Sequence, residues 1–144
     1  MTENGNPDNV VAPDNSLIPY PDDPFEMRSG PFYLRKNFDG STGVFLKVGH
    51  NQCNTNMVAH GGLLMTLADL SVCYEAVKGF PNLRALTVSL TANFLLPASK
   101  GSQLCAFPRV NYRTRRTAFV ESKIMKEDKC IFTCSSIIRV LPAG

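Results

Sequence analysis

Histidine and tryptophan are the residues this chain has least of. Its 144 residues contain no tryptophan and only two histidines, His50 and His60. Two histidines are too few for a three-histidine metal site, neither has zinc-ligand spacing with a cysteine, and no Cys-x-x-Cys pair is present. The sequence therefore predicts neither a metal site nor a serine–histidine–aspartate triad.

The five cysteines do not form a disulfide framework. Their number is odd, and the closest two, Cys130 and Cys134, lie in a strand-like segment that holds them roughly 13 Å apart. Cys73 could in principle be a nucleophile, but no histidine stands near it in sequence, so we expect an ordinary small core residue. Free thiols agree with a reducing compartment.

Membrane and nucleic-acid signals are also missing. No apolar run is long enough for a membrane span, and the polar, acidic segment 1–15 lacks the basic and hydrophobic parts of a signal peptide. The net charge of +3 is too small to indicate a nucleic-acid binder, although it suits an anionic ligand. We expect a cytoplasmic protein with no membrane or nucleic-acid partner.

The length and composition fit one domain. A chain of 144 residues with 44% hydrophobic and 19% charged residues is ordinary for a single globular core. Residues 1–21 are rich in Asn, Asp and Pro and predict a flexible N-terminal arm. Residues 22–144 then form the single domain, which begins with a short aspartate-capped helix within 22–28.

One long helix is predicted over residues 62–78. Apolar residues recur at helical spacing along one stripe, and further apolar residues fill most of the remaining circumference, as in a helix inside a protein. The only charged residue of the apolar run 63–74 is Asp69. We expect its carboxylate to be shielded from water, which opposes ionisation unless donors compensate. A general base or nucleophile is one reading, and a carboxylate that merely bonds a neighbour is the other.

The remaining elements are strands. Residues 30–37 and 42–48 predict two strands, and 103–112, 118–126 and 131–140 predict three more. In the segment 85–97, Leu86, Val88, Leu90, Ala92, Phe94 and Leu96 alternate with polar residues. That period of two predicts that all six lie on one face against a core. The fold class is therefore α+β, with five to six antiparallel strands around one central helix.

A second feature stands where the long helix begins. His60-Gly61-Gly62 precedes the apolar run, and the first turn of a helix presents unpaired N–H groups. The amide of Gly61 could stabilise the oxyanion of an acyl transfer, although a glycine-rich turn is the plainer reading. Gly61 and Asp69 are eight residues apart, which is roughly 12 Å along a helix. If they share one substrate, they come from two copies of the chain in a symmetric dimer.

These residues carry a resemblance to a known family. Residues 54–62 read Asn-Thr-Asn-Met-Val-Ala-His-Gly-Gly, and residues 67–69 read Leu-Ala-Asp. The order resembles the hotdog-fold acyl-CoA thioesterases of the phenylacetic-acid-pathway type, which have an asparagine, a few residues, His-Gly-Gly and then Leu-Ala-Asp. The likeness continues through 85–97 and the closing segment 130–140, and so covers residues 30–141.

The resemblance implies roles for five residues. The aspartate matching Asp69 acts as nucleophile or general base, and the glycine matching Gly61 supplies the backbone donor to the thioester carbonyl. The positions matching Asn54 and His60 orient the substrate or the attacking water. Thr87 stands where a hydroxyl residue of the next strand often assists.

The resemblance also implies a fold, an assembly and a substrate. It indicates the hotdog fold, a homodimer that pairs further into a homotetramer, and hydrolysis of an aromatic or medium-chain acyl-CoA. No cofactor is needed, since coenzyme A is part of the substrate. One position departs from the family pattern: the usual glycine three residues before the histidine is Met57 here. A thioether at that place could narrow the acyl pocket or reshape the loop.

Two further points stay open at the level of sequence. Arg113, Arg115 and Arg116 form a basic cluster that could bind the phosphates of coenzyme A or could be a solvated hairpin tip. The chain could also be a non-catalytic acyl-CoA-binding protein on the same fold, which would release no thiol. A hotdog dehydratase or hydratase would need another arrangement of histidine and acid.

Overall fold

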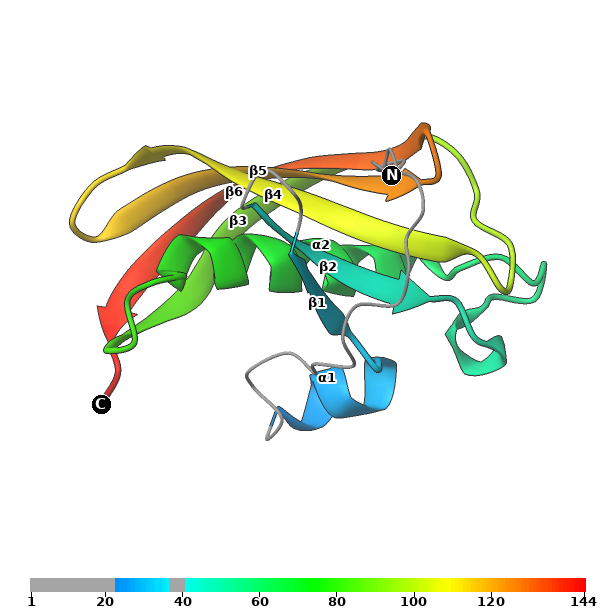
Figure 1. The fold of residues 1–144 in the computed structure, drawn as a ribbon, viewed down its shortest axis with the longest axis horizontal. Coiled ribbons are helices and arrows are strands. Elements are labelled where there is room, and N and C mark those ends of the chain that lie inside the picture. Colours follow the sequence, from blue (N-terminus) through cyan, green and yellow to red (C-terminus); the bar gives the residue numbers. More distant parts are fainter. Residues whose placement is uncertain (1–22, 37–40) are drawn as a thin grey trace, which may run out of the picture.

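The computed structural model of the protein describes residues 23–36 and 41–144. The predicted N-terminal arm, residues 1–21, and most of the turn between the first two strands lie outside these residues. Within them, the chain forms the predicted single long helix and six strands, together with a short helix at the start. The α+β hotdog prediction is confirmed (Figure 1).

The elements follow one another in a simple order. They are α1 (Pro24–Ser29), β1 (Tyr33–Lys36), β2 (Thr42–Lys47), the 3₁₀ helix η1 (His50–Gln52), α2 (Gly61–Val77), β3 (Leu83–Phe94), β4 (Gln103–Arg113), β5 (Thr117–Lys126) and β6 (Lys129–Pro142). All neighbouring strands are antiparallel, in the order β1-β2-β4-β5-β6-β3. This order places β1 and β3 at the two edges of the sheet.

The core lies between α2 and the sheet. Figure 1 shows α2 running under the sheet, with α1 on the side of α2 that faces away from it. Leu67, Ala68 and Val72 of α2 are fully buried, as are Ile124 and Phe132 of the facing strands. Because apolar burial is the main favourable term in folding, this contact fixes where α2 lies under the sheet. No helix in the described ranges is both long and apolar enough to cross a membrane.

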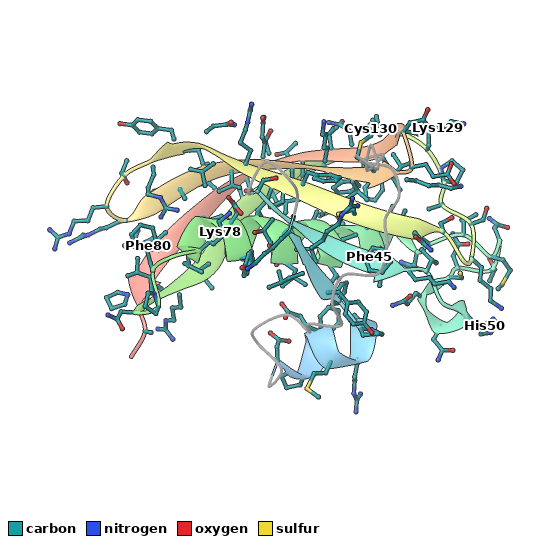
Figure 2. The ribbon with its side chains drawn as sticks, viewed as in Figure 1. Phe45, His50, Lys78, Phe80, Lys129 and Cys130 are labelled. Atoms are coloured by element: carbon teal, nitrogen blue, oxygen red, sulfur yellow. The ribbon has the colours of Figure 1, made fainter. Side chains whose placement is uncertain are left out.

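The two ends of α2 lie at opposite ends of the molecule. Lys78 and Phe80, just after the helix, lie far from His50, which precedes it (Figure 2). The helix ends where Gly79 adopts a φ of +83°, a conformation that glycine reaches without strain. A ligand that contacts both ends of α2 must therefore extend along the whole length of the molecule.

The prediction for the face of β3 is partly wrong. Leu90 and Ala92 pack against the core as expected, but Leu86 is 59% exposed and Val88 is 62% exposed. The pairing of β3 with β6 shifts register between Thr87 and Ser89, which is a β-bulge. A bulge inserts one residue and so reverses which side chains face inward. Before the bulge it is therefore Thr87, and not Leu86, that points toward α2.

The bulge gives different stability costs for two leucines of the same strand. Leu90→Ala removes a side chain packed on the core, and we expect it to lower the free energy of unfolding by about 2 kcal/mol or more. Leu86→Ala truncates a largely exposed side chain, and we expect a cost within about 0.5 kcal/mol. Urea unfolding of both variants measures the difference. Equal losses would place both leucines on one face and contradict the bulge.

Candidate active site

The start of α2 leaves one backbone donor free. His60 is the N-cap: its ring Nδ1 accepts a hydrogen bond from the N–H of Gly62 at 2.9 Å. The carbonyl of His60 accepts from Leu63 and Leu64, at 2.9 and 3.3 Å. Among the described residues, nothing accepts from the N–H of Gly61. The amide of Gly61 is thus the donor of this turn that remains for a ligand.

An aromatic ring lies beside this donor. A Cβ atom on Gly61 would meet Cε1 of Phe94, at the end of β3, at 3.4 Å. The Phe94 ring packs edge-on against Phe132, with 5.1 Å between ring centroids, yet Phe94 is 54% exposed. The free amide therefore borders an apolar surface that is open to solvent.

Two turns further along α2, Asp69 is held by the neighbouring strand. Thr87 Oγ1 donates to Asp69 Oδ1 at 2.5 Å, while Oδ2 has no hydrogen-bond partner among the residues described. The bulge in β3 is what turns Thr87 toward this carboxylate. Asp69 is half-buried, less shielded than its sequence neighbours suggested. Among the described residues, Oδ1 of Asp69 is therefore held by a hydrogen bond, while Oδ2 remains available to a ligand.

Cys73 lies next to this pair, but its thiol is a poor nucleophile. Its Sγ is 3.1 Å from Thr87 Oγ1 and 3.9 Å from Asp69 Oδ1. Burial, together with the negative charge of Asp69, raises the pKa of Cys73 to about 12. The thiolate form is therefore scarce at neutral pH. All five cysteines are free.

Glu26 of α1 is a half-buried acid that no sequence pattern indicated. Burial, with a further contribution from the charges of Asp23 and Asp69, raises the pKa of Glu26 to about 7. The two carboxyl groups of Glu26 and Asp69 are 43 positions apart and belong to different helices. The helices that carry them, α1 and α2, are in contact (Figure 1).

The loop before α2 is organised by Asn54. Its side-chain Oδ1 accepts from the backbone N–H groups of Asn56 and Val58, at 3.0 and 3.4 Å, so the amide shapes the turn. Met57, within that turn, has a φ of +58°. This left-handed conformation suits glycine and strains a residue with a side chain. The usual family glycine at this place therefore has a backbone reason, and the chain tolerates methionine there at a cost.

The three candidate arginines differ in their surroundings. Arg113 donates to the carbonyl of Ala76 at 2.5 Å and lies over the ring of Phe80, so it fastens the end of α2 to β4. Arg115 and Arg116 lie exposed in the turn between β4 and β5. They extend from the same end of α2 at which Arg113 is engaged.

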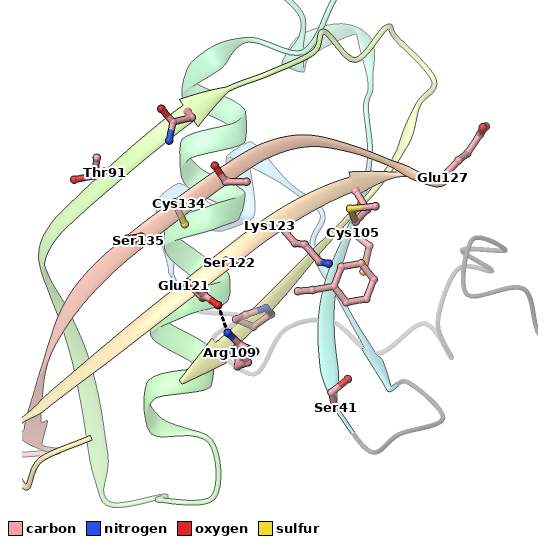
Figure 3. Close-up of a pocket in the computed structure, with 15 residues that line it drawn as sticks. Ser41, Thr91, Cys105, Arg109, Glu121, Ser122, Lys123, Glu127, Cys134 and Ser135 are labelled. Carbon is pink, nitrogen blue, oxygen red and sulfur yellow. Dashed lines mark hydrogen bonds and ion pairs between the residues drawn. The ribbon is translucent and has the colours of Figure 1, made fainter. Parts of the chain in front are cut away.

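Two observations concern other possible sites in the described part of the chain. No cluster of three or more histidine, cysteine, aspartate or glutamate side chains is present there that could hold a metal ion. A hollow of about 1060 Å³ lies on the face of the sheet away from α2, lined by Arg109, Glu121 and Lys123 among others (Figure 3). Neither Gly61 nor Asp69 contributes to its lining. The hollow is therefore separate from the candidate site.

A single copy of the chain does not bring the two reactive groups together. Gly61 and Asp69 belong to the same unbroken helix, Gly61–Val77, and are therefore separated by roughly 12 Å along its axis. The free amide and the free carboxylate oxygen cannot both touch one carbonyl carbon.

Comparison with known proteins shows the family. Residues 56–130 match the thioesterase superfamily. The chain is 30% identical over 112 residues to PA0474 of Pseudomonas aeruginosa, named as a candidate esterase, with 77% of this chain and 84% of that protein covered.

Solved structures share the fold. A mutant of the phenylacetic acid degradation protein PaaI from Thermus thermophilus superposes with a TM-score of 0.72 at 24% identity, covering 83% of this chain and 100% of that one. The BH2602 protein from Bacillus halodurans, solved with CoA, gives a TM-score of 0.70 at 22% identity, covering 77% and 74%. At these identities the likeness shows the fold alone.

The strained conformation of Met57 predicts a stabilising substitution. Met57→Gly relieves a left-handed φ and removes a side chain that is 39% exposed, so little packing is lost. We expect a gain of about 1 kcal/mol, or about 3 °C in Tm. Thermal unfolding measures it, with Met57→Ala as the control that shortens the side chain without relieving φ. If Met57→Gly is no more stable than Met57→Ala, the left-handed conformation of Met57 is not strained.

Proposed function

The chain belongs to the thioesterase superfamily, and from this premise we propose that it hydrolyses acyl-CoA thioesters to a free acid and coenzyme A. The proposal rests above all on the unpaired amide of Gly61 at the start of α2. Attack on a thioester carbonyl places negative charge on its oxygen, and a pre-oriented N–H aimed at that oxygen lowers the barrier. The His60 cap supports this role, because it holds the first turn while leaving the Gly61 donor free.

Asp69 is the proposed partner of the carbonyl carbon. Thr87 holds Oδ1, so Oδ2 either attacks the carbon directly or takes a proton from the attacking water. Asn54 positions the participants through the loop that it shapes, and His60 adds the orientation of the first turn. The thiol of Cys73 is not the nucleophile, since its raised pKa keeps it protonated.

The proposed catalytic unit is a homodimer. Since Gly61 and Asp69 of one α2 cannot reach the same carbonyl, each site combines Gly61 of one copy with Asp69 of the other. The strand β3 supports this assembly: it is twelve residues long, pairs only with β6 among the described strands, and carries the exposed side chains of Leu86 and Val88. An unpaired edge of that length favours pairing with another chain. Dimers would then associate into tetramers.

Three observations support the proposed acyl-CoA substrate. Phe94 lies beside Gly61, and it and the next two residues, Leu95 and Leu96, are all about half exposed, so they offer an apolar surface to an aromatic or medium-chain acyl group. The exposed Arg115 and Arg116 offer guanidinium groups to the coenzyme A phosphates, with Arg113 holding their hairpin in place. The CoA present in the Bacillus halodurans structure supports this choice of carrier. The free cysteines support a cytoplasmic location.

The proposed function has a direct test. A panel of aromatic and medium-chain acyl-CoA substrates is assayed for thiol release with the purified protein. Release of the thiol separates a hydrolase from a protein that only binds acyl-CoA. No release across the panel would overturn the proposal.

Two substitutions separate the proposed halves of the site. Asp69→Asn keeps the shape and removes the base, and we expect kcat to fall by about 10² to 10⁴. Gly61→Pro removes the N–H itself at the first helical position, where proline is well tolerated, and the ψ of 138° at His60 suits a following proline. We expect a loss of about 10² to 10³ in kcat with little change in Tm. Gly61→Ala is the matched control, because it adds a Cβ and keeps the N–H.

Mixing the two inactive variants tests the shared site. In a mixed dimer, the Asp69→Asn copy supplies an intact Gly61 and the Gly61→Pro copy supplies an intact Asp69. One of its two sites is then complete, so random mixing should restore about a quarter of the wild-type activity. Refolding the variants together and measuring thiol release gives the result. Activity no higher than that of the separate variants would place each whole site within one chain.

The exposed arginines predict a binding defect. Replacing Arg115 and Arg116 together by alanine should raise KM about tenfold while kcat changes less than about twofold, because the phosphates lie far from the bond that breaks. Steady-state kinetics with an acyl-CoA measure the change. The same acyl group on N-acetylcysteamine, which has no phosphates, provides the control and should show no difference. Unchanged kinetics with the acyl-CoA would show that Arg115 and Arg116 do not bind the coenzyme A phosphates.

A further inference from the structure

Three side chains of α2 and β3 lie in sequence at the candidate site. Thr87 Oγ1 is 2.5 Å from Asp69 Oδ1, and Cys73 Sγ is 3.1 Å from the same Thr87 oxygen. Cys73 follows Asp69 by four residues, so both lie on one face of α2, and the bulge in β3 turns Thr87 toward them. Cys73 is also packed against the hydrophobic core, which limits its movement. The two contacts therefore share one hydroxyl group, that of Thr87.

The proton of the Thr87 hydroxyl is used by Asp69. A hydroxyl has one proton to donate, and an ionised carboxylate can only accept. A hydrogen bond to a carboxylate oxygen is charge-assisted, whereas a thiol sulfur is a weak acceptor. The Thr87 O–H therefore donates to Asp69 Oδ1, in agreement with the short distance of 2.5 Å. No proton of Thr87 is left for Cys73.

The contact between Cys73 and Thr87 must then use the proton of the thiol. Without it, lone pairs of sulfur and oxygen would face each other at 3.1 Å. The other acceptor, Asp69 Oδ1, is 3.9 Å from the sulfur and already accepts from Thr87. Burial, with the charge of Asp69, raises the pKa of Cys73 to about 12, so the thiol keeps its proton at neutral pH. The Cys73 S–H therefore donates to Thr87.

The small hydroxyl residues of α2 use their protons differently. Thr66 donates to the carbonyl of Gly62 and Ser71 donates to that of Ala68, both at 2.8 Å. Such bonds to the preceding turn are common for serine and threonine within a helix. The contacts of the Cys73 thiol are instead with side chains of the candidate site. Cysteine thus supplies a donor directed at β3 rather than at its own helix.

We propose that Cys73 is a positioning residue of the site, whose thiol donates to Thr87 and so holds the Thr87 hydroxyl in the orientation that donates to Asp69. The inference rests on the proposed function and deepens it, because it adds a residue that prepares the carboxylate. Successive hydrogen bonds polarise one another, so each strengthens the next. With Oδ1 held in this way, Oδ2 keeps a constant direction toward the carbonyl carbon. Cys73 acts through Thr87 and forms no bond to the substrate.

A double-mutant cycle on kcat tests this coupling. We expect Cys73→Ala to lower kcat about fivefold and to change KM less than about twofold, because the thiol orients the carboxylate without binding substrate. Thr87→Val keeps the shape and removes the hydroxyl, and it should lower kcat about tenfold. In the Thr87→Val background, Cys73→Ala should cost less than about twofold, since the group through which it acts is gone. Steady-state thiol release from one acyl-CoA measures all four proteins.

The cycle separates positioning from packing. If Cys73 only fills space, its truncation lowers kcat by the same factor in both backgrounds, and that result would overturn the inference. An unchanged kcat in Cys73→Ala would overturn it as well. Cys130→Ala is the matched control, because Cys130 is another half-buried thiol, lies in β6 and donates to the carbonyl of Phe132 at 3.5 Å. This control should keep the wild-type kcat.

Infrared spectroscopy tests the hydrogen bond without any substrate. The S–H stretching band of Cys73 is the difference between the spectra of the wild type and Cys73→Ala. Donation to Thr87 weakens the S–H bond, so the band should lie at lower frequency than that of N-acetylcysteine methyl ester in a solvent that accepts no hydrogen bond. The band should also move in Thr87→Val. A band at the reference frequency, or one that does not move in Thr87→Val, would overturn the inference.

The two kinds of measurement keep the inference apart from the proposed function. A wild-type protein that releases no thiol from any acyl-CoA would overturn the proposed function. A lowered S–H frequency in that same protein would still support the hydrogen bonds from Cys73 to Thr87 and from Thr87 to Asp69. Thiol release with additive losses in the cycle would overturn the inference and leave thioester hydrolysis intact.

Discussion

The rigid rise of α2 is the constraint on which the site depends. A helix places its residues at a fixed spacing, so the free amide of Gly61 and the carboxylate of Asp69 are held roughly 12 Å apart along the axis. No side-chain movement closes that gap, because the helix is buried against the sheet along its length. Within a single protomer the two groups therefore cannot contact the same carbonyl carbon.

The rest of the structure arranges which hydrogen-bonding groups remain free around that helix. His60 satisfies the N–H of Gly62 and leaves that of Gly61 unpaired. A bulge in β3 turns Thr87 toward Asp69, so that one carboxylate oxygen is occupied and the other is not. The His60 cap and the β3 bulge are both local features, and they lie far apart in the sequence. Among the described residues, they leave the N–H of Gly61 and Oδ2 of Asp69 without a hydrogen-bond partner.

The neighbourhood of Asp69 is more acidic than the order of residues along α2 indicates. Gln52 joins α1 to the loop that carries His60, and burial, Asp23 and the charge of Asp69 together raise the pKa of Glu26. Shifted pKa values of this kind are common at functional sites. The left-handed Met57 in the adjoining loop is a further local strain, carried by the same segment between η1 and α2.

The sequence by itself determined most of the helices and strands, because these follow from local patterns. Helical spacing located α2 and its lone Asp69, alternation located the strands, and the residues before the helix indicated Gly61 and the His60 cap. Only the tertiary structure decided which groups meet. The bulge that exposes Leu86 and turns Thr87 inward has no signal in a period-two pattern, since the facing side of each residue is open until the pairing with β6 is known. Arg113 binds the end of α2, 37 residues away in the sequence, because packing and not sequence distance sets its neighbours.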